Sequence, residues 1–142
     1  MKTPYFALPL LMLLASCGMP PATDNLSYYK NPDSRIESIH VQAYNYDLGI
    51  GVPQDRKKAN QLYLEAAKAG DPRSMMNYAI NRYDGIGTDT DRVGAFYWID
   101  RARFVTQNTP DMKTKWRIRG IYDSMLKTMT PDQIRQARSR QS

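Results

Sequence analysis

The feature that most constrains the fold of this chain is an internal repeat with a period of 36 residues. The run Gly49-Ile50-Gly51 recurs as Gly85-Ile86-Gly87, and at the same shift Asp55-Arg56 recurs as Asp91-Arg92. A fixed period of this length is the signature of an architecture in which each unit buries its apolar face only against its neighbours. We therefore expect a short stack of two similar units.

Each unit has the pattern of two helices. Apolar residues recur at i, i+3, i+4 and i+7 in the second helix of both units, which gives one apolar stripe per helix. The stripes are Ala59, Leu62, Tyr63 and Ala66, then Ala95, Trp98, Ile99 and Ala102. Asp55 and Asp91 stand at N-cap positions, and the Gly-x-Gly runs supply residues for the turn between helices. No segment shows the sustained alternation of a strand, so the fold class is predicted to be all-α.

The C-terminal part predicts two further helices that close the stack. Thr109-Pro110 is a helix start signal, and Trp116, Ile118, Ile121, Tyr122, Met125 and Met129 are expected to form the apolar face that follows. Thr130-Pro131 with Gln133 predicts a second start with a capping box. The expected helices cover residues 34–47, 55–69, 72–83, 91–105, 110–128 and 131–140.

These residues resemble the Sel-one-like repeat, a relative of the tetratricopeptide repeat, over about residues 35–105. The residues that carry the resemblance include Tyr46, Gly49, Gly51, Asp55, Ala59, Ala66, Ala67 and Gly70 in the first unit and Tyr78, Ala79, Gly85, Gly87, Asp91, Ala95, Trp98 and Ala102 in the second. The resemblance implies an all-α, short right-handed solenoid of two helix-turn-helix repeats (residues 34–105) with C-terminal capping helices (residues 106–142). Gln42 and Arg82 depart from the pattern, at its leucine and tyrosine positions.

Cys17 is the single cysteine of the chain and ends the run Leu14-Ala15-Ser16-Cys17. This run closes a short apolar stretch behind Lys2, which is typical of a secretory signal and too short to span a membrane. It resembles the lipobox of bacterial lipoproteins, which implies a signal peptide (residues 1–16) and an acylated Cys17. The segment that follows is rich in proline and asparagine and has little apolar periodicity, so residues 17–33 are expected to form a flexible tether behind the acylated cysteine. Because Gly18 and not aspartate follows the cysteine, the outer membrane is favoured, with the domain facing the periplasm. An ordinary secretory signal with a free thiol is the alternative.

The charge of the chain is basic and uneven. The formal net charge is +6, and residues 101–142 hold ten Lys and Arg against three Asp. Behind a lipobox, anionic lipid head groups or an acidic protein face are better partners for this surplus than nucleic acid. A solvated helix surface is an equally simple interpretation.

The sequence offers no catalytic constellation. His40 is the single histidine, no nucleophile motif lies near it, and a His/Cys metal site cannot form from one histidine and one acylated cysteine. The Gly-x-Gly runs lack the lysine of a phosphate loop. We therefore expect neither enzymatic activity nor a metal or other cofactor.

With no catalytic or metal site expected, the remaining class of function is binding to a partner molecule. Stacked helix pairs present a concave face made mainly by the first helix of each pair. Candidate partner-binding residues on these helices, away from the predicted packing stripe, are Gln42, Asn45, Tyr46, Asn77, Asn81 and Arg82. The expected function is a lipid-anchored periplasmic module that binds a protein, as an adaptor in an envelope or secretion assembly. An immunity protein that neutralises a periplasm-acting toxin, such as a phospholipase, is the alternative, and a neighbouring toxin gene would favour it. An uncharacterised enzyme is the more distant alternative.

The lipobox generates a direct prediction. Cys17→Ser should abolish acylation, because a hydroxyl does not replace the thiolate as the acylated nucleophile. Metabolic labelling with a palmitate analogue should mark the wild-type protein and leave the variant unlabelled. Equal labelling of both would show that Cys17 is not the lipidated residue.

Overall fold

The computed structural model describes residues 34–107 and 111–140. This part of the chain is entirely helical and has no strand. Its helices are α1 (Ser34–Leu48), α2 (Arg56–Lys68), α3 (Pro72–Asp84), α4 (Arg92–Val105), α5 (Met112–Thr128) and α6 (Pro131–Ser139). The all-α prediction is confirmed, and every helix begins and ends within two residues of its expected bounds. The predicted signal peptide, Cys17 and the tether lie outside the described residues.

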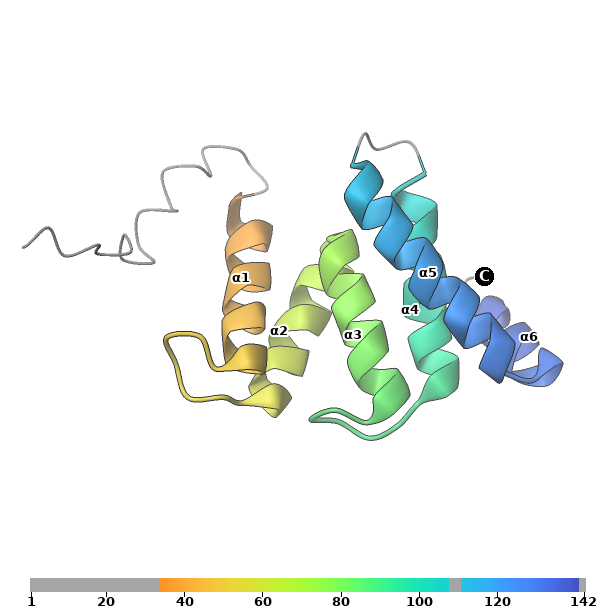
Figure 1. Ribbon diagram of the computed structural model, residues 1–142, viewed down its shortest axis with the longest axis horizontal. Helices are drawn as coiled ribbons and strands as arrows, with labels where there is room; N and C mark the ends of the chain where they lie inside the picture. The colour runs from red at the N-terminus through yellow and green to blue at the C-terminus, as the bar shows by residue number, and fades with distance from the viewer. Residues whose placement is uncertain (1–33, 108–110, 141–142) are drawn as a thin grey trace, which may run out of the picture.

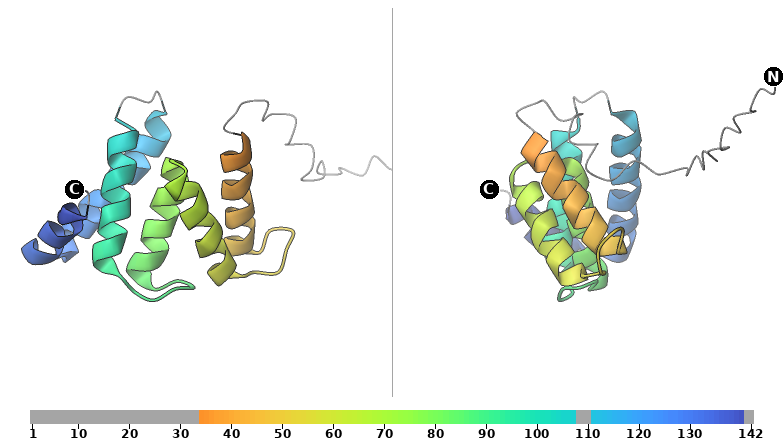
Figure 2. Two further views of the ribbon diagram at one scale, coloured as in Figure 1. Left: turned by 180° about the vertical axis from the view of Figure 1, so that it is seen from behind. Right: turned by 90° about the vertical axis from the view of Figure 1, so that its left-hand side faces the viewer.

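The helices follow one another in a row, so that contacts are made mainly between neighbours in the sequence. α1 packs against α2, α2 against α3 and α3 against α4, and α4 then contacts both α5 and α6 (Figure 1). The views of Figure 2 agree that α1 is the outermost described helix at one end of the row and α6 at the other. The described part is a short helical solenoid, as expected.

Aspartate and threonine side chains start the helices of the stack. Asp55 accepts a hydrogen bond from the Lys58 N–H (2.9 Å) at the start of α2, and Asp91 accepts one from the Gly94 N–H (2.8 Å) at the start of α4. Both predicted N-caps are thereby confirmed, as is the capping box of Thr130 at α6. The start of α5 differs from expectation, because Asp111 is its N-cap; Thr109 and Pro110 lie outside the described residues.

The two Gly-x-Gly turns share one geometry. Gly49 and Gly85 both have positive φ, at 73° and 72°, a conformation that costs glycine little. In the first turn, the Asn45 carbonyl accepts hydrogen bonds from the N–H groups of Gly49 and Ile50. In the second, the Asn81 carbonyl accepts from Gly85 and Ile86. The helix that follows each turn therefore leaves in an equivalent direction.

Two apolar clusters hold the helices together. The smaller joins α1, α2 and α3 through Ala43, Ala59, Tyr63 and Tyr78, and the larger joins α3 and α4 to the two capping helices. Trp98 of α4 packs against both clusters and meets the Tyr78 ring edge-on, with 5.8 Å between ring centroids. The repeats therefore share one continuous apolar interior.

The turns generate a paired prediction, because Gly51 and Gly87 occupy the same position of the two repeats. Both have positive φ, so alanine costs on the order of 1–2 kcal/mol at either one. A Cβ at Gly87 would also lie 2.6 Å from the Arg56 carbonyl carbon, whereas one at Gly51 would meet nothing within 4 Å. In urea unfolding followed by circular dichroism, Gly87→Ala should lower stability by about 1 kcal/mol or more beyond Gly51→Ala. Equal losses would contradict the close approach of this turn to α2.

Candidate functional site

The side chains that sequence reasoning selected for partner binding lie on α1 and α3, and the structure uses them in different ways. Gln42 is exposed, and its Nε2 makes a long hydrogen bond (3.4 Å) to the Ser38 hydroxyl one turn earlier in the helix. Asn45 is half-buried, and its carboxamide forms no hydrogen bond with any residue that the structure describes. These two side chains of α1 are available to a partner.

Asn81 has a structural task. It is 4% exposed, and its Nδ2 donates to Asn60 Oδ1 of α2 (3.0 Å), while Asn60 Nδ2 donates to the Ile86 carbonyl (2.6 Å). The expectation that Asn81 lies away from the packing face is wrong. A buried amide needs hydrogen-bond partners, and Asn81 finds its partner in the preceding helix. Asn60 was not selected from the sequence, because its position in the repeat pattern does not indicate which residues of α3 it faces.

Tyr46 and Arg82 stand at the same repeat position, and both brace the turn that follows them. The Tyr46 hydroxyl accepts a hydrogen bond from Lys58 Nζ (2.7 Å). Arg82 donates to the Tyr78 hydroxyl (2.9 Å) and to Asp91 (2.7 Å). Burial alone would lower the pKa of Arg82, but these two oxygens outweigh burial and raise it. Both side chains are half-buried and already engaged within the fold.

Asn77 is half-buried on α3 and interacts with the Tyr63 hydroxyl. Burial raises the pKa of Tyr63, and Asp47 adds to this effect, while the hydrogen bond with Asn77 opposes it. The neutral Tyr63 hydroxyl donates to Asp47 Oδ2 (3.3 Å). Of the residues selected from the sequence, Gln42 and Asn45 thus remain the least engaged, and both belong to α1.

His40, Asp71 and Ser74 form the one cluster in the described residues that resembles a hydrolytic triad in composition. Ser74 Oγ donates to Asp71 Oδ2 (2.6 Å), so it accepts from His40 Nδ1, which lies 2.8 Å away. Burial would raise the pKa of Asp71, but hydrogen bonds from His40 and Ser74 outweigh burial and lower it. Ser74 is 0% exposed, and Asp71 caps α3. This arrangement joins α1 to the start of α3 and gives Ser74 no access to a substrate.

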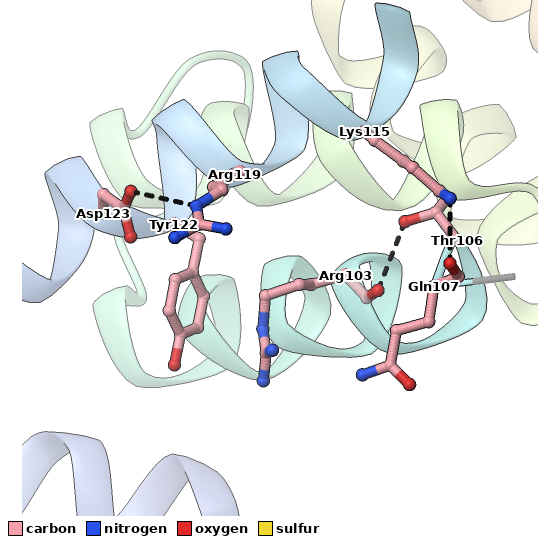
Figure 3. A pocket seen from close by; sticks show the side chains of 7 residues that line it. All are labelled: Arg103, Thr106, Gln107, Lys115, Arg119, Tyr122 and Asp123. Carbon is pink, nitrogen blue, oxygen red and sulfur yellow. Dashed lines mark hydrogen bonds and ion pairs between the residues drawn. The ribbon is translucent and has the colours of Figure 1, made fainter. Parts of the chain in front are cut away.

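A shallow groove between the end of α4 and α5 was not expected from the sequence (Figure 3). It encloses about 310 Å³ and is lined by Arg103, Thr106, Gln107, Lys115, Arg119, Tyr122 and Asp123. Most of its charged groups have partners. Arg103 pairs with Asp100 and lies over the Tyr122 ring, 4.7 Å from its centroid. Lys115 Nζ donates to the Gln107 carbonyl (2.8 Å).

Beside this groove, Trp116 and Met112 form an exposed apolar surface. Trp116 is 68% exposed and Met112 is 55% exposed, and together with Lys115 and Arg119 they line a second, smaller hollow. The expectation that Trp116 belongs to the apolar face of the capping helix is wrong. The buried face of α5 consists of Ile118, Tyr122 and Met125, and Trp116 points to a different side of the helix.

Neither a metal centre nor a membrane helix is found in the described ranges. Residues 34–107 and 111–140 contain no group of three His, Cys, Asp or Glu side chains that could hold a metal ion. Within the same ranges, no helix has both the length and the apolar character needed to cross a membrane.

Comparison with known proteins agrees with the repeat geometry. A family model of the Sel1 repeat matches residues 43–71 and 72–103. Residues 43–103 thus match two successive Sel1 repeats. A crystal structure of a Sel1 repeat protein from Oxalobacter formigenes is similar to this chain, with 26% sequence identity and a TM-score of 0.51. The similarity covers 66% of this chain but 39% of that one, so the present chain spans less than half of its relative. No curated protein matches the sequence.

The two matches place the repeats in the helices described above. The second Sel1 match begins at Pro72, where α3 begins, and it ends within α4. Sel1 repeats imply a protein–protein interaction module. In the described part of the chain, the side chains of Gln42 and Asn45 form no hydrogen bond to another helix.

Asn81 and Asn45 share a repeat position and yield a second paired prediction. Asn81→Ala should lower the free energy of unfolding by roughly 1–3 kcal/mol, because it leaves the buried Asn60 oxygen without its donor. Asn45→Ala should change it by less than about 0.5 kcal/mol, because this amide has no partner in the described fold. Urea unfolding of both variants measures the difference. A stability loss at Asn45 as large as that at Asn81 would contradict these roles.

Proposed function

We propose that the protein is a lipid-anchored periplasmic module that holds a partner protein near the membrane, as an adaptor in an envelope or secretion assembly. The observation that carries the proposal is the pair of Sel1 repeats whose first helix, α1, presents Gln42 and Asn45 without a structural task. A helix that exposes polar and apolar side chains without partners in the described fold is suited to binding another protein.

The place of the module in the cell follows from the sequence of the N-terminal segment. The lipobox-like run ending at Cys17 supports cleavage before this residue and its acylation. Two or three acyl chains anchor a protein firmly, whereas one does so only marginally. Gly18 supports the outer membrane, with the repeats in the periplasm. In this proposal the anchor restricts the module to one membrane surface, and the repeats select the partner.

The proposed function is tested by co-purification from the protein's native cells. A tagged wild-type chain should recover a specific envelope protein, and the double variant Gln42→Ala with Asn45→Ala should recover at least about tenfold less, because polar contacts to the partner are lost. Gln136→Ala on the exposed surface of α6 is the matched control and should behave like the wild type. Recovery of chaperones alone, or an unaffected double variant, would count against the proposal.

We also propose that α5 contacts anionic lipid. Trp116 and Met112 are exposed next to Lys113, Lys115, Arg117 and Arg119. Tryptophan is favoured at the interface between a membrane and water, and each basic residue near an anionic surface contributes about 1 kcal/mol. An acidic protein surface would use the same charges but has less need of an exposed apolar group.

Vesicle binding separates these two partners. The soluble form, residues 18–142, should bind vesicles that contain anionic lipid at low salt and be released at moderate salt, because the charge attraction is screened. Trp116→Ser should weaken binding at low salt without changing how steeply the affinity falls as salt is added, whereas Lys127→Ser on the same helix should make that fall less steep. Indifference to anionic vesicles, together with steeply salt-dependent binding of the co-purified partner, would assign the basic surface to that partner.

A further inference from the structure

The α1 end of the solenoid presents an uncovered surface whose counterpart, one repeat later, is covered within the molecule. On α3, the equivalent surface is occupied by α2. Asn60 of α2 bridges the two repeats there, because it accepts a hydrogen bond from Asn81 and donates one to the Ile86 carbonyl. Both asparagines are at most 5% exposed. The interface therefore contains a buried carboxamide bridge between the two helices.

The same donor and acceptor are present on α1 and in the turn that follows it. Asn45 and Ile50 stand one repeat before Asn81 and Ile86. The turns that hold them have matching hydrogen bonds and matching φ values at their glycines. In the part of the chain that the structure describes, no side chain bonds to the Asn45 carboxamide or to the Ile50 carbonyl. The Asn45 donor and the Ile50 acceptor are therefore in place, but no described side chain joins them as Asn60 joins Asn81 and Ile86.

The glycine that makes the close approach at the second turn has a counterpart at the first turn, but this counterpart is uncovered. The chain at Gly87 lies so near Arg56 at the start of α2 that a Cβ would overlap its backbone, whereas the space beside Gly51 is open. On α1 and in the turn that follows it, Val41, Tyr44, Leu48 and Ile50 are between 38% and 51% exposed. These are half of the large apolar side chains found exposed in the described residues. The uncovered end therefore combines exposed apolar side chains with a polar amide, as the α2–α3 interface does.

We propose that this end of the solenoid, α1 with its following turn, binds an amphipathic α-helix of a partner protein in the way that α2 binds α3. The partner helix would present an asparagine or glutamine whose carboxamide bridges Asn45 and the Ile50 carbonyl, with a small apolar stripe beside it. This inference rests on the proposed protein-binding function and names the chemistry of the partner at one site.

A helix of another protein fits better than the other occupants. A lipid surface offers no fixed carboxamide to pair with Asn45. A second copy of this chain cannot offer α2, because Asn60 is already engaged in its own molecule. Continuity with the α2–α3 interface therefore favours a helix from a different chain, as in the helix-in-groove mode of recognition.

The first test uses a synthetic peptide of residues 54–69, which contains α2, as a probe for the full chain in detergent. The peptide should bind and shift the NMR signals of the Asn45 side-chain amide. Asn60→Ala in the peptide removes both bridging hydrogen bonds, and Asn45→Leu in the chain removes one and leaves the oxygen of the peptide carboxamide without its donor. Each substitution should therefore weaken binding by at least about tenfold. Gln61→Ala in the peptide removes an exposed amide of the same helix and should have no effect. Binding that ignores Asn60 and Asn45 would overturn the proposal.

The second test makes the probe part of the chain, so that the low helicity of a free peptide cannot decide the result. A tandem duplication of residues 36–71 places an additional α2 before the original α1 at the natural spacing. The lengthened chain should unfold at a higher urea concentration than the wild type. Asn45→Leu in the original α1 should then destabilise the lengthened chain and leave the wild-type chain unchanged. A lengthened chain that is no more stable, or is indifferent to this substitution, overturns the proposal.

Two further results would assign the surface to another occupant and so overturn the proposal. One is a dimer in sedimentation experiments that dissociates on Asn45→Leu, which would assign the surface to a second copy of the chain. The other is peptide binding that occurs only after removal of residues 18–33, which would assign the surface to this segment of the chain. None of these experiments involves the natural partner. Their failure would therefore leave the proposed function standing, whereas a failed co-purification would leave the helix-binding end intact.

Discussion

The packing of α2 against α3 is the contact on which the rest of the structure depends. Neither helix pair can bury its apolar face alone, and this contact joins the cluster around Ala59 and Tyr63 to the larger one that contains Met75 and Phe96. It is also directional, because Asn60 fixes the register of α2 to both α3 and the turn at Ile86. Apolar burial supplies most of the driving force in such a stack, and the buried carboxamides select one arrangement among several apolar ones. The cluster of His40, Asp71 and Ser74 likewise helps to select one arrangement, because its hydrogen bonds join α1 to the first turn of α3.

The elements that could be predicted from the sequence are those fixed by local physical chemistry. Helix starts depend on a capping side chain and its neighbours, so Asp55, Asp91 and Thr130 could be identified without the structure. Turns that need positive φ favour glycine, and the matching positions of these glycines revealed the 36-residue period of the repeats. The residues that could not be assigned depend on what faces them. Trp116 satisfies the helical spacing of a core residue but is 68% exposed. Asn81 is polar but buried, because Asn60 of α2 lies opposite it and accepts its hydrogen bond. A single sequence records which side of a helix is apolar more faithfully than which polar residues meet across it.

The two ends of the solenoid differ in how completely they are covered. The C-terminal end is closed by α5 and α6, which cover the larger cluster with Ile118, Tyr122 and Ala137. The α1 end keeps an exposed apolar surface and an amide without a partner in the described fold. Solenoids need terminal units with a polar outer face for solubility, so an end that departs from this rule is a natural place for recognition. In the proposed arrangement, the α1 end is also the end nearest in sequence to the lipid anchor, which would hold a bound helix close to the membrane.

Amide hydrogen exchange tests the central claim most directly, namely that the fold is a linear stack whose stability comes from contacts between neighbouring helices. In such a stack, opening free energies vary along the chain and are largest where a helix is covered on both sides. The account predicts the slowest exchange in α3 and α4, faster exchange in α2, and the fastest in α1 and α6. Uniform protection of all helices through a single global opening, or greater protection of α1 than of α3 in the isolated protein, would contradict it.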